Sequence, residues 1–240
     1  MIDDMAFALG DAFFSEAIAM TRERAGRPVL VGLCGSQGSG KSTTAARLVR
    51  RLSGAGLRAV ACSLDDFYLT RAERAALAAT VHPLLATRGV PGTHDVGLMQ
   101  RILDALLGAG EGARTAVPTF DKAADDRAAA ERWTIHEGPA EVVILEGWCV
   151  AARPQDREAL GRAVNALERE EDADGSWRRY VNAALEGDYA ALFARLDLRL
   201  MLRAPSFECV HDWRAGQEAG LPRDDPAARP PVTPPPPSPL

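Results

Sequence analysis

The 240-residue chain has few cysteines and no long hydrophobic run. Its four cysteines, Cys34, Cys62, Cys149 and Cys209, form no C-x-x-C pair and no metal-binding spacing, which predicts buried free thiols in a reducing compartment. No apolar run approaches the roughly 18 residues that a membrane span needs, and the first residues, Met-Ile-Asp-Asp-Met, are acidic where a secretory signal is basic. We therefore expect a soluble, cytoplasmic protein without a membrane partner.

The chain also lacks an excess of positive charge. Lysine and arginine number 28 against 33 aspartates and glutamates, a net charge of −5. A DNA or RNA partner would call for a basic surface, so we expect no nucleic-acid ligand. The length suits one α/β domain, which we place at residues 1–221. Nine of the sixteen prolines fall in residues 222–240, which predicts a disordered or polyproline II tail.

One segment joins a short apolar run to a glycine-rich turn and a helical pattern. Residues 29–43 match G-x-x-x-x-G-K-S/T between a predicted buried strand and a helix with apolar residues at i, i+3, i+4 and i+7. Glycines let successive N–H groups curl around phosphate oxygens, and a helix N-terminus favours an anion. The alternative is a glycine-rich turn without a ligand. We predict triphosphate binding by Gly35, Ser36, Gln37, Gly38, Ser39, Gly40, Lys41, Ser42 and Thr43, with Lys41 on the β- and γ-phosphates and Ser42 on Mg²⁺.

The predicted elements are typical of a P-loop NTPase fold. A strand at 58–63 follows the helix after the glycine-rich turn, and this order implies a parallel sheet with a right-handed crossover. Further strands are expected at 141–145 and 196–202, in a three-layer α/β/α domain with a mostly parallel central sheet. Helices are predicted at 5–24 with Phe13, Ile18 and Met20 among the apolar positions, around Leu98, Ile102 and Leu106, at 157–170 with Leu160, Val164 and Leu167, and at 176–195.

Two aspartates, Asp65 and Asp66, directly follow the second predicted strand. The carboxyl ends of parallel strands form the ligand-binding edge of such sheets. Asp65 is therefore placed to accept the proton of a substrate hydroxyl, which contributes roughly 10²- to 10⁴-fold to a rate. The alternative is a helix N-cap, because residues 70–78 are compatible with a helix. For Asp66 we expect a cap or a position beside the metal and substrate.

Glu146 ends the apolar run Val-Val-Ile-Leu at 142–145. A buried strand that delivers a carboxylate toward Mg²⁺ has this form in phosphate-loop enzymes. Any strand can end in glutamate, so the prediction depends on the phosphate-binding loop upstream. We predict Glu146 and Ser42 as the metal-associated residues.

With these motifs the chain resembles the phosphoribulokinase and uridine kinase superfamily, and within it the D-glycerate 3-kinase group. Arg88-Gly-Val-Pro-Gly-Thr-His-Asp95 is the segment most specific to that group. The resemblance implies that Asp65 is the catalytic base, that Glu146 is the metal-associated acid, and that Arg214 belongs to a lid at about 203–221. The matching segments are residues 35–42, 63–70, 82–85, 88–95, 118–122, 146–148 and 213–214.

The chemistry of the acceptor suggests further residues. Glycerate is a small hydroxy acid whose carboxylate needs a cation, best a bidentate arginine, whereas a nucleoside would need stacking surfaces. Each candidate has a structural alternative: Arg88 as a surface charge, Asp95 or Thr93 as a helix cap, and Asp121 with Lys122 as a solvated ion pair. The cationic candidates are Arg88, His94, Lys122 and Arg127, and the predicted substrate set is Asp66, Tyr68, Arg88, His94, Asp95, Asp121 and Lys122.

We therefore expect an ATP- and Mg²⁺-dependent kinase that phosphorylates a hydroxyl of a small acid, D-glycerate above all, with Lys41, Asp65 and Arg214 as catalytic residues. One alternative is a uridine kinase-like enzyme with another acceptor. A nucleotide switch is a second, although the chain lacks the Asn-Lys-x-Asp motif of GTPases. The third is an ATP-binding protein with impaired catalysis, because Gly216 and the proline-rich tail depart from the group's pattern near the lid. The sequence leaves the oligomeric state open.

Overall fold

The computed structural model describes residues 2–204, 206 and 210. Arg214, most of the expected lid, Gly216, Cys209 and the proline-rich tail lie outside the described residues. No helix within the described part is long and apolar enough to cross a membrane. Cys34, Cys62 and Cys149 are free thiols, of which Cys62 and Cys149 are buried as predicted and Cys34 is half-buried. Burial raises the pKa of Cys62 and Cys149 to about 12.

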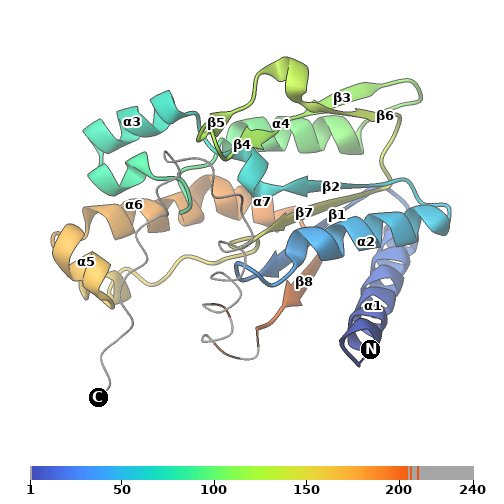
Figure 1. Ribbon diagram of the computed structural model, residues 1–240, viewed down its shortest axis with the longest axis horizontal. Coiled ribbons are helices and arrows are strands. Elements are labelled where there is room, and N and C mark those ends of the chain that lie inside the picture. The colour runs from blue at the N-terminus through green and yellow to red at the C-terminus, as the bar shows by residue number, and fades with distance from the viewer. Residues whose placement is uncertain (1, 205, 207–209, 211–240) are drawn as a thin grey trace.

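A four-stranded parallel sheet forms the centre of the molecule (Figure 1). The strand β7, Val142–Gly147, is buried at every residue, because its neighbours pair with both of its edges and helices cover both faces. The sheet order is β2-β7-β1-β8, with β2 at Ala59–Ser63, β1 at Val29–Gly35 and β8 at Leu198–Leu202. The predicted strands and their parallel arrangement are confirmed.

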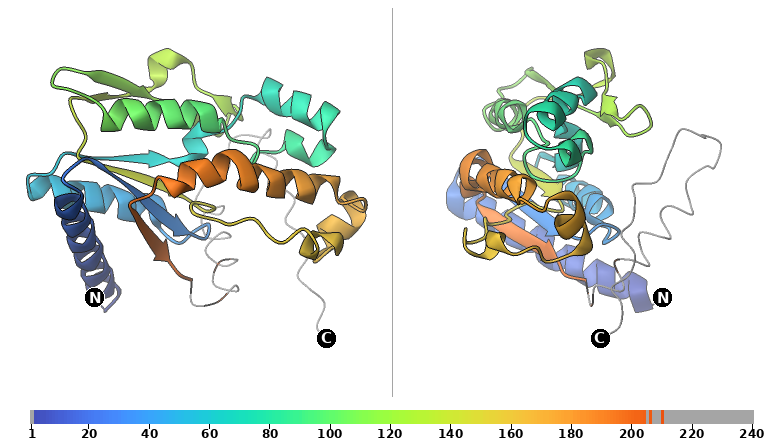
Figure 2. Two further views of the ribbon diagram at one scale, coloured as in Figure 1. Left: turned by 180° about the vertical axis from the view of Figure 1, so that it is seen from behind. Right: turned by 90° about the vertical axis from the view of Figure 1, so that its left-hand side faces the viewer.

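Helices cover both faces of this sheet, which confirms the three-layer α/β/α architecture (Figure 2). On one face, α1 (Ile2–Ala25) and α2 (Lys41–Gly54) pack through Ile18, Leu48 and Leu52. Of the three apolar positions named in the first helix, only Ile18 is buried, whereas Phe13 and Met20 are 67% and 43% exposed. The opposite face is covered by α4 (Val96–Leu107), a π-helical turn (Leu185–Tyr189) and α7 (Ala190–Ala194).

The predicted helix at 157–170 is wrong. That stretch contains a 3₁₀ turn, Ala159–Gly161, and a short α5, Ala166–Glu171. Asn165 has extended backbone and its side chain accepts a hydrogen bond from the Glu168 N–H, so α5 begins only after it. Val164 is 76% exposed as a result. The prediction at 176–195 is confirmed as α6 (Ser176–Ala184), the π-helical turn and α7, with a backbone break at Gly187.

The segments between β2 and β7 form helices and short strand pairs outside the central sheet. The helix α3, Arg71–Thr80, begins at Thr70, whose side chain forms a capping box with Glu73. A 3₁₀ turn, Pro83–Ala86, then leads to α4. Two antiparallel pairs follow: β3 (Arg114–Val117) with β6 (Thr134–Glu137), and β4 (Phe120–Asp121) with β5 (Asp126–Arg127). The β4–β5 hairpin brings residues 120–127 close to Asp65.

Candidate active site

The glycine-rich turn between β1 and α2 has the geometry of a phosphate-binding loop. Gly38 and Gly40 have φ values of 76° and 80°, a left-handed conformation that favours glycine. A Cβ on Gly35 would lie 2.6 Å from Ser39 Oγ, so this position has no room for a side chain. Since α2 begins at Lys41, its free N–H groups and positive dipole end lie at this loop.

The polar groups of this loop suit an anion. Lys41 Nζ donates to the Ser36 carbonyl at 2.8 Å, which folds the lysine back over the loop. Among the described residues, the buried Oγ atoms of Ser36 and Ser39 have no hydrogen-bond partner. Buried hydroxyls are normally satisfied, so two unpaired donors beside a lysine fit a loop that binds phosphate oxygens.

Glu146 and Ser42 meet beside this loop. Ser42 Oγ donates to Glu146 Oε1 at 2.7 Å, and Glu146 is 4% exposed at the end of β7. In the parallel register Glu146 lies opposite Ser63, two residues before Asp65. A hydroxyl and a buried carboxylate in contact provide the oxygen ligands that Mg²⁺ prefers.

Asp65 lies in the 3₁₀ turn Leu64–Phe67 that follows β2. Its carboxylate accepts hydrogen bonds from Lys122 Nζ at 3.0 Å and from the Tyr68 hydroxyl at 3.3 Å. Its side chain is 35% exposed, so it remains accessible. The capping alternative is wrong for both aspartates, because Thr70 is the N-cap of α3.

Asp66 has a different environment. Its Oδ1 accepts a hydrogen bond from the Phe120 N–H at 3.0 Å, which fastens the β4–β5 hairpin to the end of β2. Burial raises the pKa of Asp66, and the Phe120 hydrogen bond partly opposes this. Asp66 therefore holds the hairpin next to Asp65.

His94 lies in a buried aromatic stack. Its ring is stacked on Tyr68 with centroids 4.3 Å apart, and its Nδ1 lies 2.6 Å from the Tyr189 hydroxyl. Burial lowers the pKa of His94 to about 3. His94 is therefore neutral near pH 7 and does not provide the cation expected from the sequence. The same burial raises the pKa of the Tyr68 hydroxyl, which stays protonated beside Asp65.

The side chains of Asp95 and Arg127 form hydrogen bonds with nearby backbone groups. Asp95 Oδ1 accepts from the Leu98 N–H at 2.8 Å as the N-cap of α4, which confirms that alternative for Asp95. Its Oδ2 lies 3.3 Å from Arg127 Nη2, which also donates to the Tyr68 carbonyl at 2.9 Å. Both side chains fix the segment around Tyr68.

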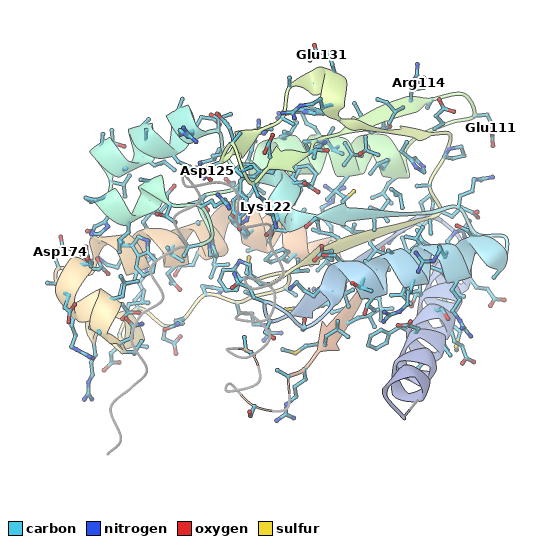
Figure 3. All side chains as sticks on the ribbon, in the orientation of Figure 1. Glu111, Arg114, Lys122, Asp125, Glu131 and Asp174 are labelled. Carbon is cyan, nitrogen blue, oxygen red and sulfur yellow. The ribbon has the colours of Figure 1, made fainter. Side chains whose placement is uncertain are left out.

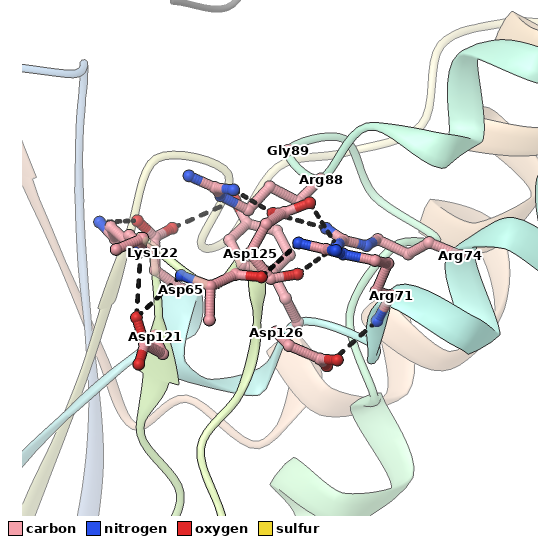
Figure 4. A network of polar contacts seen from close by, with 12 residues as sticks. Asp65, Arg71, Arg74, Arg88, Gly89, Asp121, Lys122, Asp125 and Asp126 are labelled. Carbon is pink, nitrogen blue, oxygen red and sulfur yellow. Dashed lines mark hydrogen bonds and ion pairs between the residues drawn. The ribbon is translucent and has the colours of Figure 1, made fainter. Parts of the chain in front are cut away.

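Figure 4 shows the charged network around the β4–β5 hairpin. Asp121 accepts from the Ala124 and Ala123 N–H groups and pairs with Arg132, and these contacts lower its pKa. Lys122 pairs with Asp65, so the alternative of a solvated Asp121–Lys122 ion pair is wrong.

Arg88 pairs with Asp125, which also binds the fully buried Arg74. The sequence reasoning missed both Arg74 and Asp125. Arg74 sits in an ordinary helical pattern, and Asp125 lies in a run without periodicity. Figure 3 places Asp125 and Lys122 together above the carboxyl edge of the sheet.

A pocket of about 570 Å³ lies between α3 and α6, lined by residues such as Leu77, His94 and Tyr180. No residue of the phosphate-binding loop lines it. We place the candidate active site at the loop, Glu146 and Asp65, because those side chains can bind phosphate and transfer a proton.

The fold and this site together define a P-loop kinase. A family model described as the phosphoribulokinase / uridine kinase family matches residues 30–152, and the chain belongs to that family. It is 36% identical over 203 residues to an uncharacterized kinase of Schizosaccharomyces pombe, covering 82% of this chain and 72% of that protein.

Two other similar proteins are D-glycerate 3-kinases. The chloroplastic D-glycerate 3-kinase of Arabidopsis thaliana is 30% identical over 204 residues, which cover 82% of this chain and 42% of that longer protein. A solved structure of D-glycerate 3-kinase from Cryptococcus neoformans superposes with a TM-score of 0.74 at 26% identity, covering 87% of this chain and 78% of that one. Members of this kinase class use ATP, and the loop geometry fits that donor.

Proposed function

We propose that this kinase transfers the γ-phosphate of ATP to a hydroxyl of a small hydroxy acid, with D-glycerate as the acceptor. The observation that carries the proposal is the position of Asp65. An accessible carboxylate lies at the carboxyl end of β2, beside the strand that ends in Glu146 and its contact with Ser42. A general base beside a phosphate-binding loop suits phosphoryl transfer to an alcohol.

Each residue then has a distinct task. Lys41 and the N–H groups of residues 35–43 hold the triphosphate, and Ser42 with Glu146 would hold Mg²⁺, which neutralises phosphate charge when bound. Asp65 accepts the proton of the acceptor hydroxyl. Tyr68 and Lys122 orient the Asp65 carboxylate, and the acceptor hydroxyl replaces one of these contacts.

The choice of acceptor has two supports. Two of the similar proteins bear the name D-glycerate 3-kinase. Two cations also support it: the Lys122 ammonium contacts Asp65, and the Arg88 guanidinium pairs with Asp125 of the β4–β5 connection. Arg214, which lies outside the described residues, is proposed to close over the phosphates from the lid.

An acceptor panel tests the proposal. ADP release by the full chain with ATP and Mg²⁺ is measured in a coupled assay with D-glycerate, L-lactate, glycerol, uridine or no acceptor. We expect release that depends on D-glycerate and exceeds the rate without acceptor at least tenfold. Release with uridine alone would assign a nucleoside kinase, and release independent of every acceptor would contradict a kinase for small acids.

A further inference from the structure

Resting on the proposed function, the geometry points to Asp125 as an internal substitute for the acceptor carboxylate. We propose that the Asp125 carboxylate pairs with the Arg88 guanidinium while the acceptor is absent. The carboxylate of the incoming hydroxy acid then replaces Asp125 as the partner of this guanidinium. Arg88 is then the residue that selects acids over neutral alcohols, and Asp125 sets how tightly they bind.

Asp125 accepts more hydrogen bonds from Arg74 than from Arg88. Arg74 donates to Asp125 through Nη1 to Oδ1 at 3.2 Å and through Nη2 to Oδ2 at 2.8 Å, and Nη2 also reaches the Asp125 carbonyl at 2.7 Å. Within the described part of the chain, Arg88 has one hydrogen-bond partner, Asp125 Oδ1. The Arg74 side chain is 0% exposed and the Arg88 side chain is 31% exposed. Arg74 therefore keeps Asp125 in place when Arg88 leaves it.

The backbone around Asp125 is held in an uncommon conformation. Asp125 has a φ of 52°, in the left-handed region that non-glycine residues rarely occupy. Its neighbours anchor it, because Asp121 accepts from the Ala124 N–H at 3.0 Å and Asp126 accepts from the Arg71 N–H at 3.1 Å. The hairpin holds this carboxylate against Arg74 and Arg88, and among the described residues no other acid forms an ion pair with either arginine.

Arg88 and the proposed base lie around the same hairpin (Figure 4). The Arg88 guanidinium lies 5.4 Å from the centroid of the Phe120 ring, and the Phe120 ring meets the Tyr68 ring edge-on at 5.4 Å. Tyr68 in turn donates to Asp65. Phe120 and Tyr68 therefore connect Arg88 to the Asp65 carboxylate through successive contacts.

The other cationic candidates are uncharged or hold groups that the proposal leaves in place. His94 is buried and neutral, as described above. Arg127 holds the Tyr68 carbonyl and Asp95, and its side chain is 14% exposed. Lys122 contacts Asp65 itself. When the acceptor replaces Asp125 on Arg88, one carboxylate takes the place of another, so the guanidinium keeps a negatively charged partner. The acceptor carboxylate can also form a bidentate contact with the arginine.

Substitutions of Asp125 and of Arg88 should change the KM for D-glycerate in opposite directions. Asp125→Asn keeps the side-chain shape, tolerates the left-handed backbone and retains an acceptor for Arg74, but it no longer competes as a carboxylate. We expect the D-glycerate KM to fall about three- to tenfold in D125N. Arg88→Gln should raise the ratio of the D-glycerate KM to the glycerol KM at least tenfold, and Arg88→Lys should recover part of the loss. Glu131→Gln, which changes an exposed acid between β5 and β6, is the control.

A D125N variant whose D-glycerate KM rises would show that Asp125 builds the site and does not compete, and would overturn the proposal. An R88Q variant with an unchanged KM ratio would overturn it as well. Thermal melting of each variant shows whether it folds, and if D125N does not fold, the R88Q and R88K pair decides the question.

A binding measurement distinguishes failure of the proposed kinase function from failure of the proposed role of Arg88 and Asp125. If the wild type phosphorylates no hydroxy acid, D-glycerate binding is measured by calorimetry in the presence of a non-hydrolysable ATP analogue. Tighter binding to D125N and weaker binding to R88Q than to the wild type would still support the Arg88 site. Equal affinities in all three proteins, or no binding to any of them, would overturn it.

Discussion

Asp65 is the single residue on which the proposed chemistry most depends. Asp65→Asn preserves the shape of the side chain, but an amide NH₂ replaces one of the two oxygens that accept from Tyr68 and Lys122, and the side chain cannot take a proton. We expect turnover to fall at least about a hundredfold, because a positioned base contributes roughly 10²- to 10⁴-fold, while nucleotide affinity stays unchanged. Steady-state kinetics and nucleotide calorimetry measure the two effects. Asp104→Asn, which changes an exposed acid of α4, is the control, and an unchanged D65N rate would contradict the assignment.

His94 makes the stability of the fold depend on pH. Its folded pKa of about 3 lies below the ordinary 6.5, so between these values the unfolded chain binds a proton that the folded chain does not. The free energy of unfolding should therefore fall as pH drops below 6.5, by up to about 1.4 kcal/mol per pH unit from this group. Denaturant unfolding at pH 7 and pH 5 measures the slope. His94→Gln should give a shallower slope, and an equal slope would mean that other groups carry the effect.

The elements differ in how much of their structure is local. Residues 29–54 contain the complete strand, glycine-rich loop and helix in one contiguous stretch. The structure confirms the predicted strand as β1 and the predicted helix as α2. The predicted helix at 157–170 is wrong because a capping side chain, Asn165, starts a shorter helix than the apolar spacing suggested. The β4–β5 hairpin has strands of two residues each, too short for an alternating pattern to show. It is held by contacts from the end of β2 and the start of α3.

At the level of the whole molecule, nucleotide binding should stabilise the fold. A ligand that binds only the folded state adds about 2.7 kcal/mol at a concentration of 100 times its Kd. ATP with Mg²⁺ should therefore raise the melting temperature of the full chain, and Lys41→Ala should remove most of the rise. A melting temperature that does not respond to ATP would contradict a competent loop. A rise without phosphorylation of any acceptor would place the defect outside the loop and favour the alternative of impaired catalysis.

The sequence by itself determined the glycine-rich loop with its flanking strand and helix, and the positions of Asp65 and Glu146 at the ends of two strands, because each depends on a short contiguous pattern. Only the tertiary structure decided how the charged candidates pair. Lys122 reaches Asp65 across 57 positions and Arg88 reaches Asp125 across 37. Burial, which depends on packing, made His94 neutral. Such pairings follow from where the β4–β5 hairpin lies against β2 and α3, and no local spacing encodes that position.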